Sequence, residues 1–156
     1  MISQNFKFYK IISHIGNKIY IGKTRKQLNI RFSEHKSHYR LYQNDNSNYT
    51  SSFELFDEYT VDNCSIELIT EVLCNKMHAC IIEGNYMKAF FDNPLLFECV
   101  NHNIAGRTRQ EYRLANIDKI NCKYQCQCHG KYTYQGFGQH LKTKKHINYI
   151  KLLLII

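Results

Sequence analysis

Two short stretches, FKFYKIIS at residues 6–13 and KIYIGK at residues 18–23, decide how the first part of this chain folds. Both are rich in Ile, Tyr and Phe, the residue types that favour extended strands. Gly16-Asn17 lies between them and supplies the positive φ that a tight hairpin turn needs. The pattern therefore predicts two adjacent antiparallel strands.

The next elements alternate between helical and extended patterns. Residues 27–43 place apolar and aromatic side chains at helical spacing with basic residues between them, which predicts a long amphipathic helix. The polar run at 44–52 indicates a loop, with Ser51 or Ser52 capping a short helix that ends near residue 59.

A third strand and a second long helix follow. Residues 64–72 alternate as a strand does, and residues 75–91 have a helical pattern that Pro94 prevents from continuing. We therefore expect an α/β core, in which helices flank a small three-stranded antiparallel or mixed sheet.

A change of composition after Gly106 marks the end of this core. The segment that follows is rich in charges, and then Cys, Tyr and Gly dominate. We expect a core domain at 4–105, a helical linker at 106–121 and a small module at 122–151. A chain of 156 residues is too short for two full-sized domains.

The net charge of the chain indicates what kind of molecule it binds. The 21 Lys and Arg against 13 Asp and Glu give a formal net charge of +8, which favours a polyanion such as DNA, with RNA as the weaker alternative.

No apolar run approaches the roughly 18 to 20 residues that span a bilayer, and no secretory signal opens the sequence. We expect an intracellular protein, in the cytoplasm or nucleus and not secreted, whose seven Cys are reduced. The sequence leaves the oligomeric state open.

Several motifs of the core resemble, in order, those of the GIY-YIG endonuclease family. They are FYKI at 8–11, YIGKT at 20–24, RFSEH at 31–35, IEGNY at 82–86 and CVN at 99–101, running into AGR at 105–107. The first triplet departs from the family, because Lys7-Phe8-Tyr9 keeps only its Tyr. The resemblance implies a metal-dependent endonuclease that hydrolyses DNA phosphodiester bonds. The pairing with a C-terminal Cys/His module is most similar to stand-alone enzymes of viruses or mobile elements.

The resemblance assigns roles to five residues of the first half. It makes Tyr9 the general base or water-orienting group and Tyr20 its partner at the phosphate. Lys23 serves the site, where its charge can lower the pKa of a nearby phenol. Arg31 and His35, four residues apart on one helix face, become the phosphate clamp and its assistant.

A carboxylate and an amide complete the implied site. Glu83 lies among Ala79, Cys80, Tyr86 and Met87 at helical spacing, so a charge interrupts an apolar face. Such a carboxylate needs either a metal or an ion-pair partner. The resemblance makes it the ligand of a catalytic Mg²⁺ or Mn²⁺. It also implies a terminal Asn that positions a phosphate or braces the site; Asn101 fits better than Asn103, because CVN has the pattern of a strand end.

A second constellation lies near the C-terminus. Cys126-x-Cys128 and His140-x5-His146 offer two thiolates and two imidazoles, the ligand set of a structural zinc site, and Cys122 or His129 can replace one of them. Alternation along a flat strand would bring the two sulfurs together, and Gly130 would permit the turn that follows.

The surroundings of these ligands match a ββα-like zinc finger. Tyr132 and Phe137 are its small apolar core, and residues 139–149 its helix. Four lysines on or beside this helix would face DNA: Lys142, Lys144, Lys145 and Lys151.

Two rivals of another class remain. The chain can be a non-catalytic DNA- or RNA-binding protein whose nuclease core has decayed, or an RNA-directed binder built around the finger. The joint presence of the motif residues argues against decay. The target sequence and the choice between nicking and double-strand cutting are left open.

Overall fold

The computed structural model describes residues 2–154. The chain divides into two compact units, the first ending at Arg107 and the second beginning at Thr108. Within the described residues, none of the helices combines the length and the apolar composition that a membrane crossing requires.

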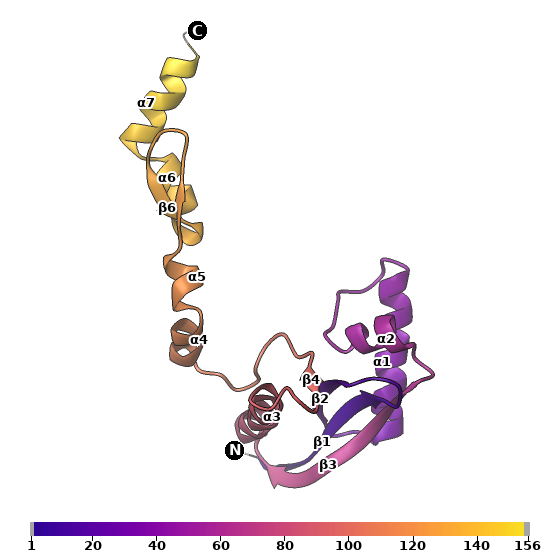
Figure 1. The fold of residues 1–156 in the computed structure, drawn as a ribbon. Coiled ribbons are helices and arrows are strands. Elements are labelled where there is room, and N and C mark those ends of the chain that lie inside the picture. The colour runs from indigo at the N-terminus through magenta and orange to yellow at the C-terminus, as the bar shows by residue number, and fades with distance from the viewer. Residues whose placement is uncertain (1, 155–156) are drawn as a thin grey trace. The chain divides into compact units, whose positions relative to one another are not determined.

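A four-stranded mixed sheet forms the centre of the first unit (Figure 1). Its strands are β1 (Gln4–Ser13), β2 (Lys18–Thr24), β3 (Cys64–Cys74) and β4 (Glu98–Cys99), in the order β3-β1-β2-β4. β1 is antiparallel to β2 and β3, whereas β4 is parallel to β2. The α/β class is confirmed, but the expectation of three strands missed β4, because two residues are too short to display alternation.

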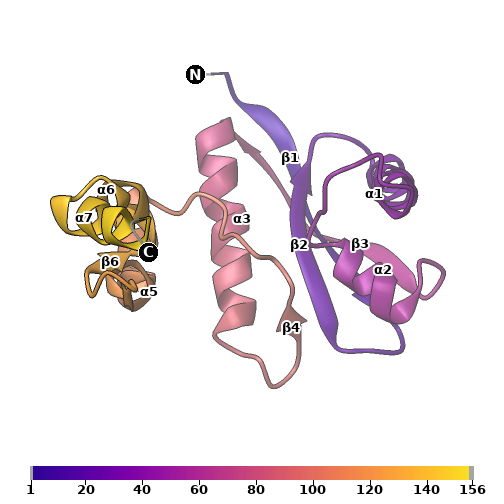
Figure 2. The same cartoon turned by 90° about the horizontal axis from the view of Figure 1, so that it is seen from above.

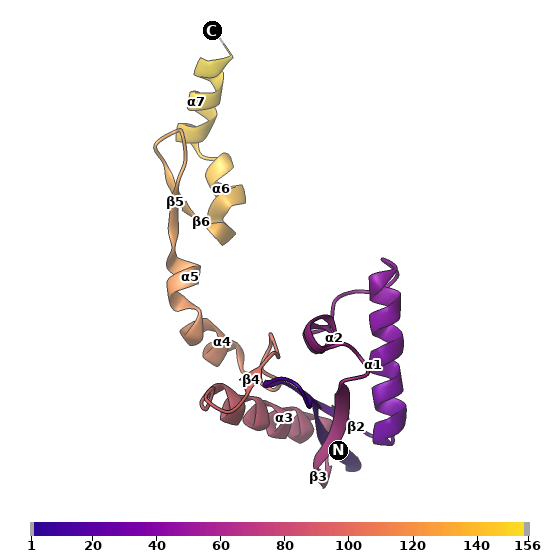
Figure 3. The ribbon, with the colours of Figure 1, turned by 45° about the vertical axis from the view of Figure 1, so that its right-hand side comes forward.

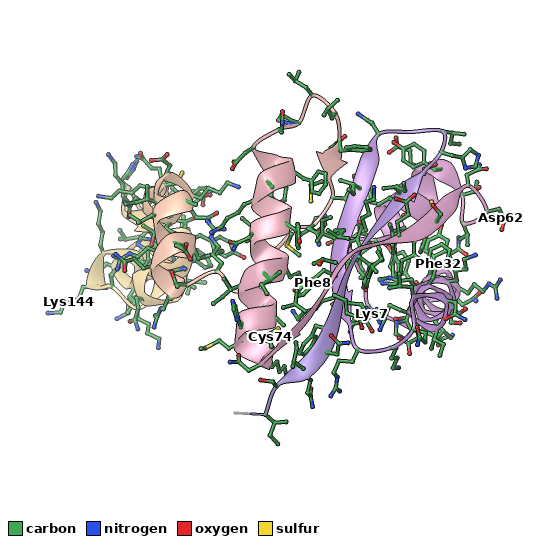
Figure 4. The ribbon with its side chains drawn as sticks, turned by 90° about the horizontal axis from the view of Figure 1, so that it is seen from below. Lys7, Phe8, Phe32, Asp62, Cys74 and Lys144 are labelled. Atoms are coloured by element: carbon green, nitrogen blue, oxygen red, sulfur yellow. The ribbon has the colours of Figure 1, made fainter. Side chains whose placement is uncertain are left out.

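Helices cover both faces of this sheet (Figure 2). α1 (Leu28–Gln43) and α2 (Phe53–Tyr59) lie on one face, and α3 (Lys76–Phe91) on the other. Ile11 packs with Tyr39 and Phe53 on the α1 and α2 side. Phe8 and Cys74 pack on the α3 side, and Figure 4 shows them between the sheet and that helix. Both faces of the central strands β1 and β2 are therefore covered, whereas the edge strand β3 exposes polar side chains such as Glu67 and Glu71 along its length.

The hairpin between β1 and β2 differs from the expected tight turn. The loop spans residues 14–17, and Gly106 is the only described glycine with a positive φ. A Cβ on Gly16 would lie 2.2 Å from Cζ of Tyr59. Gly16 is thus required because the Tyr59 ring packs directly on it, and the positive φ that we expected there is wrong.

The second unit consists of short elements (Figure 3). They are α4 (Arg109–Ala115), α5 (Ile117–Asn121), β5 (Lys123–Gln125), β6 (Lys131–Thr133), the 3-10 turn η1 (Tyr134–Gly136), α6 (Phe137–Leu141) and α7 (Lys144–Leu153). The helical character expected before residue 122 is present as two helices. The single helix expected over 139–149 is wrong, because Thr143 interrupts it and its side chain accepts a hydrogen bond from the His146 N–H as the N-cap of α7.

Candidate functional site

Two tyrosines of the hairpin lie on the face that α1 covers. In the β1–β2 register Tyr9 is opposite Gly22, and Tyr20 is opposite Ile11, so both phenols are on one face. Their ring centroids are 6.5 Å apart. Gly22 is required here, since a Cβ at this position would lie 2.5 Å from the Tyr9 hydroxyl oxygen. The glycine of the YIG triplet therefore makes room for the phenol.

Helix α1 adds a cation and an imidazole to these phenols. Arg31 Nε donates to the Tyr9 hydroxyl at 3.0 Å. His35 Nε2 lies 2.8 Å from the same hydroxyl, and the His35 ring is 5.4 Å from that of Tyr20. The i, i+4 spacing predicted that Arg31 and His35 share a face, and the structure brings both to Tyr9.

Ser52 is a member of this cluster that the sequence did not reveal. Its hydroxyl lies 2.9 Å from His35 Nδ1 and is fully buried. We expected Ser51 or Ser52 to cap α2, but Ser52 makes no such hydrogen bond, and Ser51 Oγ accepts from the N–H of His102. No local sequence signal identifies this role, because the partner is 17 residues away in the chain.

The donor and acceptor in each hydrogen bond of this cluster follow from the chemistry of Arg31. A guanidinium can only donate, so the Tyr9 oxygen accepts from Arg31 and its own proton is available to His35 Nε2. The other His35 nitrogen then donates to Ser52. Burial, with a smaller contribution from the positive charge of Arg31, lowers the pKa of His35 to about 3, so the imidazole is neutral near pH 7.

The phenols are also neutral. Burial raises the pKa of Tyr9 although the charge and hydrogen bond of Arg31 lower it, and burial raises the pKa of Tyr20. Lys23, which we expected to lower the pKa of a phenol, is not among the main causes of either shift. Its ammonium is instead engaged by a carboxylate on the α3 side of the sheet.

Glu83 is that carboxylate. Its Oε2 lies 2.5 Å from Lys23 Nζ, and the residue is 9% exposed. Burial lowers the pKa of Lys23, but the hydrogen bond and charge of Glu83 outweigh it, and the net shift is upward. The ion-pair partner that the sequence left open for Glu83 is thus present.

The Lys23–Glu83 ion pair and the Tyr9–Arg31 hydrogen bond are connected at the end of β2, through Lys23 and Arg31. A surface pocket of about 490 Å³ there is lined by both Lys23 and Arg31, with Glu34 and residues 24–26. Beside the larger effect of burial, the negative charge of Glu83 contributes to the raised pKa of Tyr9 and of Tyr20. This pocket presents four cationic side chains, those of Lys23, Arg25, Lys26 and Arg31, where an anion can enter.

Asn101 braces the sheet. Its Oδ1 accepts from the Ile21 N–H at 2.8 Å and its Nδ2 donates to the Ile21 carbonyl at 2.9 Å. These bonds hold the backbone of β2 at the residue between Tyr20 and Gly22. Of the two roles that the resemblance allows, the geometry corresponds to bracing. Asn103 is exposed.

The second unit contains a cluster of four metal-ligating side chains. Cys126, Cys128, His140 and His146 each offer one donor atom, and these atoms all lie within 4.8 Å of one another. Cys126 Sγ is 3.4 Å from His146 Nδ1, and Cys128 Sγ is 3.4 Å from His140 Nε2. Two sulfurs and two nitrogens at this separation can hold a metal such as zinc in tetrahedral coordination. The alternatives Cys122 and His129 are not in the group.

The sulfurs converge through a turn and not along a flat strand, contrary to expectation. The His129 N–H donates to the Cys126 carbonyl, and the Cys126 N–H donates to that of Gly130. His129, at φ 58°, makes the turn that we expected of Gly130. A Cβ on Gly130 would be 2.5 Å from the His140 ring, so this glycine gives the ligand room.

Of the two rings expected to form the apolar core of the module, Tyr132 is partly buried and Phe137 is exposed. The Tyr132 ring stacks on His140, with centroids 5.0 Å apart, and lies 5.0 Å from Phe137. Lys145 Nζ donates to the His129 carbonyl. Figure 4 shows Lys144 extended away from the unit.

Comparison of the chain with models of protein families, with curated proteins and with solved structures found no match.

Proposed function

We propose that this chain is an endonuclease of the GIY-YIG type, which hydrolyses DNA phosphodiester bonds. The observation that carries the proposal is the cluster in which the Tyr9 hydroxyl joins Arg31 and His35, with Lys23 and Glu83 at the same end of β2. Five polar residues from four elements have no need to meet in a merely structural core.

Arg31 and Lys23 bind the scissile phosphate in this proposal. A guanidinium offers a fork of donors to phosphate oxygens, and an ammonium adds a point charge. Both cations line one pocket, so the negative charge that develops on the phosphorane would be opposed from two sides. Tyr20, which is partly exposed, donates to the same phosphate.

Tyr9 orients the attacking water. With its proton donated to neutral His35, the phenol oxygen has two lone pairs; Arg31 uses one, and the other is available to water. The raised pKa of Tyr9 favours this role over that of a phenolate base. The phenol is buried, so water reaches it when Arg31 turns toward a bound phosphate.

Glu83 would hold Mg²⁺ or Mn²⁺. The fit rests on donor type: Glu83 offers one carboxylate beside Lys23, and one is enough because Mg²⁺ keeps several waters and takes phosphate oxygens. Bound there, the ion would supply positive charge at the phosphate and leaving oxygen. Lys23 keeps the carboxylate oriented through the ion pair.

The second unit anchors the enzyme on nucleic acid. It contains nine Lys and Arg against two Asp and Glu, a net charge of +7, whereas residues 1–107 contain 12 against 11, a net +1. Zinc at the Cys/His cluster would stabilise this unit. The rival, a binding protein with an inactive core, shares this part and differs only in the first unit.

The direct test is incubation of purified protein with supercoiled plasmid, with and without added Mg²⁺ or Mn²⁺. We expect metal-dependent nicking or linearisation, and Arg31→Ala should slow it by roughly 100-fold or more. Arg40→Ala, at the exposed end of the same helix, is the matched control and should cut normally. Wild-type protein that binds the plasmid and leaves it intact with either metal would establish the non-catalytic rival.

A further inference from the structure

A groove lined by aromatic rings runs along the second unit. Three hollows share their walls: the first two have Tyr112, Ile120 and Gln135 in common, and the last two have Tyr124 and Tyr134. The groove therefore continues from α4 past the β5–β6 hairpin to Phe137 at the start of α6.

The rings of this groove are unusually accessible. Tyr134 is 81% exposed, Tyr124 46% and Phe137 44%. A small module that needed these rings for its core would cover them; here Tyr132 supplies the packing against His140, while Tyr124 stacks on its outer side at 5.9 Å. The rings thus offer free π faces along a path.

Positive charge accompanies the same path. Arg109 and Arg113 line the first hollow, and Lys119 lines the second. They belong to the unit that carries a net +7 of the total +8. Aromatic faces on which bases stack, set in a positive groove that follows the backbone, are how proteins hold unpaired nucleic acid. A duplex cannot use them, because its bases are already stacked on one another.

We infer that this groove is a binding site for single-stranded nucleic acid, separate from the lysines of α7 that face a duplex. Tyr134 and Tyr124 stack with bases, and the arginines of α4 contact phosphates of the same strand farther along the groove. The inference goes beyond the proposed cleavage and does not depend on it, because binding is measured without added Mg²⁺.

Tyr134 allows the test, because its exposure means that the fold does not depend on its side chain. Affinity of the full-length zinc-loaded protein for a fluorescent oligo(dT) is compared among wild type, Tyr134→Ala and Tyr134→Phe. Tyr134→Ala should weaken binding by roughly 5- to 100-fold, and Tyr134→Phe should restore it. Leu154→Ala, at the same 81% exposure in the same unit, should have no effect. A duplex of equal length should bind both Tyr134 variants equally well.

A second readout detects stacking itself. The chain contains no Trp, so Tyr134→Trp introduces one reporter whose fluorescence a stacked base quenches. Quenching by oligo(dT) or oligo(U), with little quenching by duplex, supports the inference; comparison of the two strands separates DNA from RNA. Equal affinity of Tyr134→Ala and wild type for both strands, or equal quenching by duplex, would overturn it. In that case the lysines alone account for the binding.

Discussion

The variant Glu83→Gln distinguishes the proposed enzyme from the non-catalytic rival. Because Glu83 forms an ion pair with Lys23, the substitution also lowers the stability of the first unit. Loss of one partner of a fully buried pair costs about 3–5 kcal/mol. The Lys23 and Glu83 side chains are 19% and 11% exposed, so Lys23 can turn to water and we expect about 1–3 kcal/mol. For a unit of this size that lowers the Tm by roughly 5–15 °C.

Cleavage should change far more than stability. If Glu83 holds the catalytic metal, its replacement by an isosteric amide should slow plasmid nicking by about 100-fold or more. Binding to uncut plasmid should persist, because the second unit carries most of the charge. Rates are measured below the Tm of the variant, at saturating protein, and circular dichroism establishes that it is folded.

Two further variants make the result decisive. Glu71→Gln breaks a comparable pair, Lys7–Glu71 at 2.8 Å, and should leave cleavage unchanged. The double variant Lys23→Gln/Glu83→Gln removes both charges and so should recover part of the stability without recovering activity. A Glu83→Gln protein that cuts at the wild-type rate would refute the metal assignment. A double variant that folds and cuts would mean that the pair is structural only.

Four other outcomes are expected. Purified protein should contain about one equivalent of Zn²⁺ by metal analysis, and Cys128→Ser should lose it and unfold the second unit while the first keeps its circular dichroism; zinc-free protein grown in ample zinc would contradict this. Truncation after Lys119 should flatten the plot of log affinity against log salt by about 0.9 per lost phosphate contact, and an unchanged slope would exclude residues 120–156 as a DNA contact. The pKa of His35 is lowered to about 3 in the folded state, so between pH 3 and the ordinary value of 6.5 the unfolded chain binds one more proton than the folded chain. On acidification through this window the free energy of unfolding of the wild type, measured by urea titration, should fall by about 1.4 kcal/mol per pH unit relative to that of His35→Gln. The control variant His78→Gln changes an exposed histidine and should follow the wild type. Gly22→Ala should destabilise the first unit by roughly 1–3 kcal/mol, since the new Cβ would meet the Tyr9 ring, and a variant as stable as wild type would show that the ring can move.

Local patterns predicted the elements that are long enough to show a period. Helices α1 and α3 and the first three strands follow from their spacing, whereas β4 has too few residues to form a pattern. The break at Thr143 did carry a local signal, a Thr that can cap, but the spacing of the two His ligands favoured one continuous helix.

The parts of the candidate site that depend on contacts between distant residues were harder to predict. The sequence placed Arg31 and His35 on one face, but it could not reveal that Ser52 completes the chain of hydrogen bonds, because a serine in a polar loop has no distinguishing pattern. The pairing of Lys23 with Glu83 could not be predicted either, because the two residues lie 60 positions apart and come together only when α3 packs on the sheet. Gly16 and Gly130 were interpreted through backbone freedom, although the space needed by neighbouring rings explains both.

The Asn101 side chain has a consequence for how this protein behaves at high concentration. Its amide bonds both the N–H and the carbonyl of Ile21, as a neighbouring strand would, at a point on β2 that β4 no longer reaches. An unpaired strand edge is a template on which a second chain can add a strand and begin to aggregate. One side chain therefore terminates the sheet at Ile21, and the residue that holds the candidate site in place also keeps this edge from recruiting another molecule.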